Sequence, residues 1–140
     1  MIRLANADDA GQLEILNNEF NGAGETTLKR IKESLLNNKQ EFVIVAEEKG
    51  QLVGFVCVQL KKSFCYDEYM PEITEAYVKP DYRKQGIATR MFKFAEEKLK
   101  AEIPFHRIEL LTGKGNFTAK RFYRKLGYKN DGEVHLSKSI

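Results

Sequence analysis

A basic, glycine-containing turn lies where a predicted strand gives way to a long predicted helix. It reads Arg83-Lys84-Gln85-Gly86-Ile87-Ala88. The first turn of a helix carries unpaired N–H donors and about half a positive charge, and both stabilise an anion. Gly86 has no Cβ, so a ligand can approach the backbone closely. The pattern therefore predicts an anion cradle, for which phosphate is the commonest ligand.

Two common phosphate-binding motifs do not account for this turn. The Gly-Lys pair at Gly113-Lys114 is followed by Gly115 and lacks the earlier glycine of the Walker pattern. The dinucleotide pattern fails because Thr118 stands where its last glycine is required. The alternative to a phosphate site is a cationic loop before a surface helix, in which Gly86 serves the turn alone.

Composition limits the classes of protein to consider. With 140 residues the chain can form one domain around a buried core. A net charge of +3 is too small to indicate nucleic-acid binding by itself. The sequence has no apolar run long enough for a bilayer and no secretory signal at its start, so we expect a cytoplasmic protein without a membrane partner. The two cysteines and two histidines lack metal-ligand spacing, and we expect no metal site.

Hydrophobic spacing predicts the elements that position the turn. We expect the order β-α-α-β-β-β-α-β-α-β-β. The strands are predicted over residues 1–5, 42–46, 52–60, 73–78 and 106–112 and in a closing hairpin of 128–129 with 134–136. The clearest helices span 86–100 and 116–126, and two shorter ones begin near 8–9 and 26–27. Hairpins are antiparallel, whereas the crossover between 73 and 112 favours a parallel pair. The fold class is therefore α/β, with a mixed, mostly antiparallel sheet of about six to seven strands and about four helices on both faces.

Two segments resemble the GNAT superfamily of acyl-CoA-dependent N-acetyltransferases. The segment VKPDYRKQGIATRMF is similar to its pyrophosphate-binding turn, [RQ]-x-x-G-x-[GA], filled here by Arg83, Gly86 and Ala88. The segment NFTAKRFYRKLGY resembles the family's N-x-x-A-x-x-[FL]-Y-x-x-x-G-[FY]. The close resemblance covers about residues 43–128. It implies one N-acetyltransferase domain over residues 1–140, a GNAT-like fold, and acetyl-CoA (coenzyme A) as the cofactor.

The resemblance also implies which residues contact the cofactor. The turn would bind pyrophosphate, the strand before it would pair with the pantetheine arm, and one asparagine would contact that arm. The residues concerned are Ala76, Tyr77, Val78, Arg83, Lys84, Gln85, Gly86, Ile87, Ala88, Thr89 and Asn116.

Acetyl transfer needs a neutral amine, a hydrogen-bond donor for the oxyanion and a proton for the departing thiolate. Tyr123 stands where the family often places the general acid, although a half-buried aromatic would fit the same pattern. Glu75, on the predicted strand beside the acetyl group, is the candidate base, acting directly or through water. Its alternative is an exposed strand carboxylate, with catalysis arising largely from positioning.

Carboxylates and aromatics gather in a loop beside the expected acceptor groove. Such a mixture suits a cationic amine, through ion pairing and cation–π contact, although a charged loop is often simply solvated. An aminoglycoside, a polyamine or a lysine-like amine would fit. The candidate substrate-binding residues are Phe20, Glu25, Asp67, Glu68, Tyr69 and Glu72.

Other functions stay open from sequence. The acceptor could be a protein or peptide amine, and the chain could instead be an acyl-CoA-binding module without turnover. The basic, aromatic segment 114–125 invites a nucleic-acid interpretation, but a phosphate-bearing cofactor explains it as well, and we expect no nucleic-acid partner. Exchange or pairing of edge strands could make a homodimer.

Overall fold

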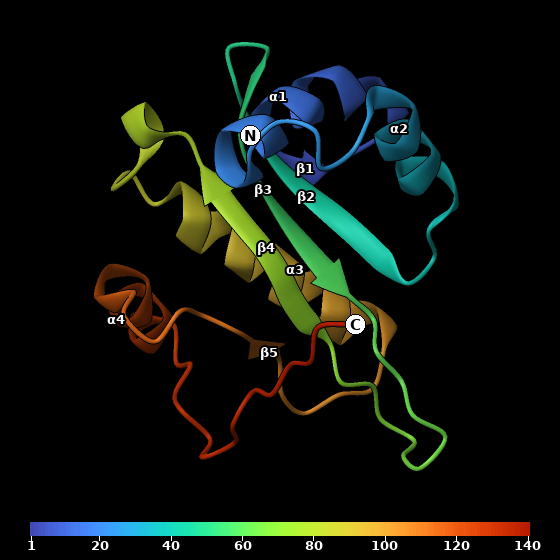
Figure 1. Cartoon of the computed structure of the whole chain (residues 1–140), viewed down its shortest axis with the longest axis vertical. Coiled ribbons are helices and arrows are strands. Elements are labelled where there is room, and N and C mark those ends of the chain that lie inside the picture. The colour runs from blue at the N-terminus through green and yellow to red at the C-terminus, as the bar shows by residue number, and fades with distance from the viewer.

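The computed structural model describes residues 1–140 and shows a central sheet between two helical layers (Figure 1). Two short 3₁₀ turns, Ala7–Asp9 and Pro80–Tyr82, precede α1 and α3. None of the four helices combines the length and apolarity that a membrane span requires. The strands are β1 (Ile2–Leu4), β2 (Glu41–Glu48), β3 (Gln51–Gln59), β4 (Glu72–Val78) and β5 (Glu109–Leu110), and the helices are α1 (Ala10–Asn21), α2 (Leu28–Asn37), α3 (Ile87–Glu102) and α4 (Phe117–Lys125).

The sheet has the strand order β1-β2-β3-β4-β5. The first four strands are antiparallel neighbours, and β5 runs parallel to β4. This confirms the mixed, mostly antiparallel sheet. The β4–β5 pairing is short, because it joins Glu72 with Glu109 and Ile73 with Leu110 and ends there. Beyond Ile73 the two strands separate.

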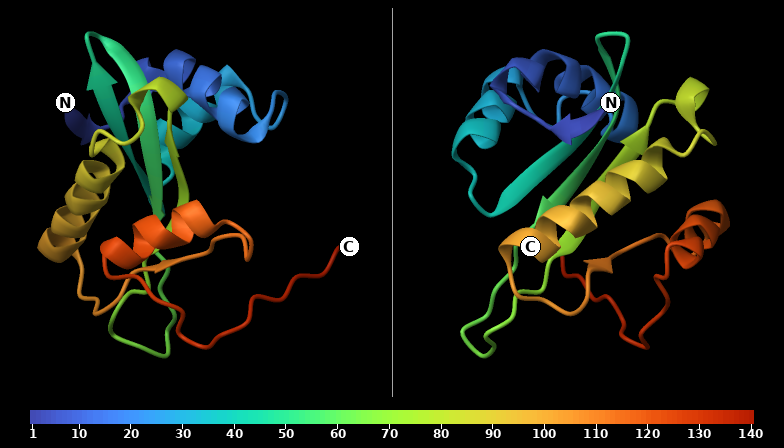
Figure 2. Two further views of the ribbon diagram at one scale, coloured as in Figure 1. Left: turned by 90° about the vertical axis from the view of Figure 1, so that its left-hand side faces the viewer. Right: turned by 180° about the vertical axis from the view of Figure 1, so that it is seen from behind.

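Each face of the sheet is covered by its own helices, as Figure 2 shows from the side. Alternate side chains of a strand point to opposite faces, so β2 sends Ile44 one way and Val45 the other. Ile44 packs in a cluster with Met91 and Phe92 of α3. Val45 packs in a second cluster with Leu16 of α1. The expectation that helices cover both faces is thus confirmed.

The helix α4 joins the α3 layer through aromatic contacts. The ring centroids of Phe92 on α3 and Phe122 on α4 lie 5.6 Å apart in an edge-on arrangement. Asn116 caps α4, since its side-chain oxygen accepts a hydrogen bond from the backbone N–H of Ala119 at 3.2 Å. Packing on α3 and this cap together hold α4 opposite β4, across the gap where β5 diverges.

The closing hairpin and the predicted strand count are wrong. The sheet has five strands rather than six or seven, and the order ends β-α after α3. Residues 129–140 form no strand, and Val134 and Leu136 are exposed. Asn130 and Asp131 instead accept hydrogen bonds from backbone N–H groups two residues later, which closes local turns. The apolar alternation in this tail therefore faces solvent rather than a core. The strand predicted over 106–112 is likewise reduced to β5.

Candidate active site

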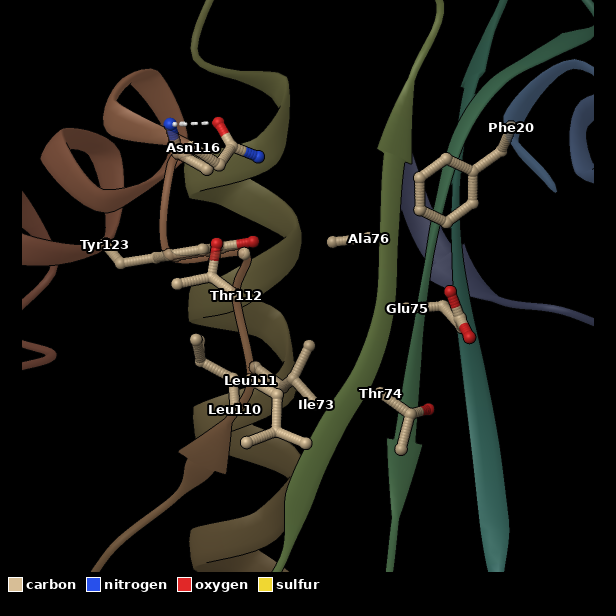
Figure 3. Close-up of a pocket in the computed structure, with 12 residues that line it drawn as sticks. Phe20, Ile73, Thr74, Glu75, Ala76, Leu110, Leu111, Thr112, Asn116 and Tyr123 are labelled. Atoms are coloured by element: carbon tan, nitrogen blue, oxygen red, sulfur yellow. Dashed lines mark hydrogen bonds between the residues drawn. The ribbon is translucent and has the colours of Figure 1, made fainter. Parts of the chain in front are cut away.

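A cavity of about 270 Å³ opens where β4 and β5 separate (Figure 3). Its walls come from β4, from the segment that links β5 to α4, and from α4 itself, and one aromatic side chain reaches it from α1. The lining residues are Phe20, Ile73, Thr74, Glu75, Ala76, Leu110, Leu111, Thr112, Gly113, Asn116, Ala119 and Tyr123. The cavity thus unites the C-terminal motif with the strand before the glycine turn.

A β-bulge lies on β4 at the floor of this cavity. Cys57 of β3 pairs with Glu75, whereas the next residue, Val58, pairs with Ile73. Thr74 is therefore left without a partner on β3. A bulge bends its strand and increases its twist. This bulge lies at the point where β4 leaves β5, so the backbone of β4 beyond Ile73 presents an unpaired edge to the cavity.

The glycine turn precedes α3 in the conformation that an anion cradle needs. Gly86 caps the helix with φ of 81°, and Lys84 also has a positive φ of 62°. The N–H groups of the four residues 86–89 have no acceptor within the chain. A Cβ added to Gly86 would meet nothing within 4 Å, so the space in front of the turn is open. These features fit a pyrophosphate group.

Arg83 fastens this turn to β4. Its Nε donates a hydrogen bond to the backbone oxygen of Val78 at 2.8 Å. Its guanidinium lies 5.6 Å from the ring centroid of Tyr77, a cation–π contact. The amide of Gln85 donates to the backbone oxygen of Asp81 at 3.2 Å. Arg83 therefore positions the turn against the strand, besides adding positive charge beside it.

Tyr123 enters the cavity from α4. Figure 3 shows its hydroxyl directed toward Ala76 of β4, with Thr112 beside it. The ring packs against Phe92 of α3, with centroids 5.9 Å apart, and against Phe122. Burial raises the pKa of the Tyr123 hydroxyl above its usual value, so this group stays protonated at neutral pH. Asn116 lines the same wall and uses its oxygen for the cap of α4, which leaves its amide N–H groups free.

Glu75 borders the cavity from the other face of β4. Its register partner Cys57 and its neighbour Tyr77 belong to the face that carries α1 and α2. The carboxylate makes no hydrogen bond or ion pair within the chain. Burial raises its pKa above the usual value. A carboxylate with a raised pKa is a stronger base than one in water, which suits proton abstraction from an amine.

Aromatic side chains form a wall above Glu75. Phe20 of α1 stacks on Tyr77 with ring centroids 5.2 Å apart, and both contact Phe55. The Tyr77 hydroxyl donates to a carboxylate oxygen of Glu19 at 3.3 Å. This cluster joins α1 to β4, and its Phe20 borders the cavity on the α1 side.

The acidic loop that the sequence analysis selected does not line the cavity. It projects from the end of the sheet between β3 and β4 (Figure 1). Glu68 lies 3.2 Å from His106, and Glu72 pairs with Lys61 at 2.8 Å. The ring of Tyr69 lies under Lys62. Asp67 and Glu25 are exposed, and Glu25 lies in the turn between α1 and α2. Of the predicted acceptor residues, Phe20 alone borders the cavity.

Sequence reasoning missed one carboxylate on the face of Glu75. Glu41 begins β2, and its pKa is raised by burial and by the charge of Glu75. The predicted strand began one residue later, at Phe42, so Glu41 fell outside the pattern. Its spacing of two residues from Val43, and of four from Val45, was the available signal. Other missed residues form the β5 side of the cavity: Leu110, Leu111 and Thr112.

Comparisons with known proteins agree with this geometry. The model of the acetyltransferase (GNAT) family matches residues 11–128. An uncharacterized N-acetyltransferase from Archaeoglobus fulgidus is 33% identical over 92 residues, which are 64% of this chain and 60% of that protein. The chain thus spans less than two thirds of the length of this relative.

Solved structures with low sequence identity share the fold. An aminoglycoside acetyltransferase from an uncultured soil metagenomic sample, in complex with sisomicin, has a TM-score of 0.87 and 17% identity, with 100% of this chain and 95% of that chain covered. A ribosomal-protein-alanine N-acetyltransferase from Brucella melitensis has a TM-score of 0.83 and 18% identity, with 99% and 98% covered. At these identities the likeness concerns the fold alone.

The family match covers most of the chain, including the glycine turn, the strand before it and the α4 motif. The chain therefore belongs to the GNAT family of acetyltransferases.

Proposed function

We propose that the protein transfers an acetyl group from acetyl-CoA to the primary amine of a small cationic molecule. GNAT acetyltransferases use acetyl-CoA. The observation that carries the proposal is the continuous path from the glycine turn to the cavity. The unpaired N–H groups of residues 86–89 lie at one end, and the free edge of β4 leads from there to Glu75 and Tyr123.

The cofactor supplies an activated acetyl group as a thioester, and the chain's residues supply its binding and the proton transfers. Residues 86–89 bind pyrophosphate through their N–H groups, and Arg83 and Lys84 add positive charge. Residues 76–78 offer the pantetheine amides the edge of β4 that no strand covers, on which the backbone oxygen of Val78 already accepts a hydrogen bond from Arg83. The free amide N–H groups of Asn116 reach the same arm. These contacts hold the thioester beside the bulge at Thr74.

Glu75 and Tyr123 divide the proton transfers. Glu75 accepts a proton from the amine, directly or through water, so that nitrogen can attack the thioester carbon. A C–N bond then forms and the C–S bond breaks. Tyr123 donates its proton to the departing thiolate. Its raised pKa keeps the hydroxyl protonated before that step, so the proton is available. Backbone N–H groups of β4 near Tyr77 stabilise the oxyanion.

The acceptor reaches this site from the α1 side. Phe20, Tyr77 and Phe55 offer aromatic faces there, and Glu75 offers negative charge. Both features favour an ammonium group. A protein or peptide amine is the second candidate. It is supported by the β3–β4 loop, which projects from the end of the sheet (Figure 1) and contributes no residue to the lining of the cavity.

A thiol-release assay tests the proposal. The protein is mixed with acetyl-CoA and, separately, with small amines and with peptides bearing a free N-terminus or lysine. We expect amine-dependent release of coenzyme A and an acetylated small amine detected by mass spectrometry. Release with peptides alone would favour the second candidate. Tight binding of acetyl-CoA without release for any amine would instead indicate a non-catalytic acyl-CoA-binding module.

A further inference from the structure

Glu41 and Glu75 face one another across β3 on the α1 side of the sheet. Glu41 of β2 is paired with Gln59, and Glu75 of β4 is paired with Cys57. Gln59 and Cys57 are two residues apart on β3, so all four side chains project from the same face. The two carboxylates therefore flank a short column of β3 residues, one from each neighbouring strand.

Neither carboxylate has a partner within the chain. The chain has 23 lysines and arginines, and several of them pair with other glutamates. None of them forms an ion pair or a hydrogen bond with Glu41 or Glu75. Both side chains are half-buried. Partly buried, unpaired carboxylates are costly, and two of them near each other cost more because like charges repel. Retaining both is explained if a cationic group of a ligand compensates them.

The thiol of Cys57 lies between the two carboxylates and also lacks a hydrogen-bond partner. Burial and the charges of Glu41 and Glu75 together raise its pKa. The thiol is thus kept neutral, and it does not offset the negative charge of either carboxylate. The negative charge on this face is consequently left for a bound molecule.

The spacing indicates which molecule fits. Strands lie about 4.8 Å apart and residues advance about 3.4 Å, so a two-strand, two-residue offset separates the Cα atoms of Glu41 and Glu75 by about 12 Å. The charge of Glu75 contributes to the raised pKa of Glu41, so the two carboxylates lie within electrostatic range of each other. A molecule with two ammonium groups joined by a short alkyl chain can therefore pair with both. Glu75 borders the cavity, whereas Glu41 lies farther from it.

We propose that the acceptor is a diamine or longer polyamine, and that Glu41 is the specificity residue that binds its second ammonium group while Glu75 receives the reacting amine. This inference rests on the proposed acetyl transfer. The aromatic wall of Phe20 and Tyr77 would cover the alkyl chain beside Glu75. An acceptor with one amine would lose the contact with Glu41 but keep the reacting geometry.

The test compares 1,4-diaminobutane with 1-aminobutane as acceptors for the wild type and a Glu41→Gln variant. We expect the wild type to favour the diamine in kcat/KM by about tenfold, the effect of one charge-assisted hydrogen bond. Glu41→Gln should remove this preference and leave 1-aminobutane within about twofold. Glu97→Gln, an exposed substitution on α3, is the matched control and should keep the preference.

Binding supplies a second readout. Calorimetric titration of 1,4-diaminobutane into protein saturated with coenzyme A should show an affinity that falls about tenfold in Glu41→Gln. Equal use of both amines by the wild type, or an equal loss for both in Glu41→Gln, would overturn the role of Glu41. Glu41-dependent binding without thiol release would support the diamine site and contradict acetyl transfer. Neither binding nor release with the diamine would overturn the inference.

Discussion

Glu75 and Tyr123 border one cavity from opposite faces of β4. Glu75 projects from the face that carries α1 and α2, where it pairs with Cys57. Tyr123 comes from α4 on the α3 side, where it packs against Phe92. During acyl transfer the attacking amine nitrogen and the departing sulfur are separate substituents of the tetrahedral carbon, so each needs its own proton-transfer group. The two groups are therefore placed to handle one proton each, without competing for the same position.

The hydroxyl of Tyr123 is expected to matter for turnover and little for stability. Tyr123→Phe keeps the ring contacts with Phe92 and Phe122 but removes the proton donor. We predict that kcat falls by about 10²-fold, with Tm nearly unchanged. Steady-state thiol release and differential scanning fluorimetry check this. Turnover equal to that of the wild type would remove Tyr123 as the acid.

Tyr128 offers the control for that experiment. Its ring lies 6.2 Å from that of Tyr123, and its hydroxyl is buried without a hydrogen-bond partner. Tyr128 does not line the cavity. Tyr128→Phe should therefore leave kcat within about twofold, and it should not destabilise the protein, because it removes an unsatisfied polar group. A large loss of activity in this variant would show that the aromatic cluster, rather than the Tyr123 hydroxyl, is what the rate responds to.

The base role of Glu75 predicts a particular pH dependence. Burial raises the pKa of Glu75, so the carboxylate is protonated, and inactive as a base, over a wider acidic range than an exposed glutamate. The ratio of wild-type to Glu75→Gln kcat/KM should be near one at acidic pH. It should rise as the pH passes through the raised pKa and reach about 10²-fold at pH 8. Taking this ratio cancels the ionisation of the amine itself. A ratio that does not change with pH would contradict the assignment.

Gly54 controls the position of β4, the strand proposed to bind the cofactor. A Cβ at this residue of β3 would lie 2.7 Å from the backbone oxygen of Tyr77, and 3.2 Å from Met91 and Val78. Gly54→Ala must therefore push β4 away. We predict a loss of about 1–3 kcal/mol in the free energy of unfolding, and weaker acetyl-CoA binding. Urea denaturation and calorimetry measure the two effects.

Gly11 is the matched control for Gly54. It lies in α1, and a Cβ there meets nothing within 4 Å. Gly11→Ala should stabilise the protein by about 0.5–1 kcal/mol, because glycine is a poor helix former. If Gly54→Ala were equally harmless, the close contact between β3 and β4 would not be what sets the position of β4.

Local signals in the sequence predicted the parts of the site that depend on neighbouring residues. The glycine turn, the helix after it and the helix predicted over 116–126 are each defined by residues a few positions apart. Their spacing predicted a strand, a glycine turn and two helices, and the structure has all of them. The anion-binding role of the turn stays a prediction. The burial of both sheet faces was also predictable, because β2 is continuously apolar from Phe42 to Ala46 and the apolar stripe of α3 is a property of that helix alone.

The features that the sequence did not predict depend on contacts between distant segments. The bulge at Thr74 follows from the register of β3 against β4, which no local pattern specifies. Glu41 approaches Glu75 because β2 and β4 both flank β3. In the C-terminal tail the sequence predicted a strand that the structure lacks. Val134 and Leu136 alternate with polar residues as in a strand, but both lie exposed. Periodicity gives the face that a segment could bury, and tertiary packing decides whether it does.

The acidic loop illustrates a related limit. Its carboxylates and aromatics were grouped because they are neighbours in sequence. In the structure Glu68 lies beside His106 and Glu72 pairs with Lys61 at the end of the sheet, whereas the half-buried, unpaired Glu41 and Glu75 lie within the sheet on β2 and β4. Composition predicted a negative and aromatic surface for a cation. Their assignment to this loop stays a prediction, which the structure gives no contact to support.

The most direct test of the account is a calorimetric titration of acetyl-CoA into the wild type, Gly86→Glu and Gly132→Glu. Both glycines have a positive φ and open space around them, so both substitutions impose similar backbone strain. Gly86→Glu also places bulk and negative charge in the proposed pyrophosphate cradle. We predict binding by the wild type and Gly132→Glu, and a loss of at least about tenfold in affinity for Gly86→Glu. Equal binding by all three proteins, or binding by none, would contradict the account.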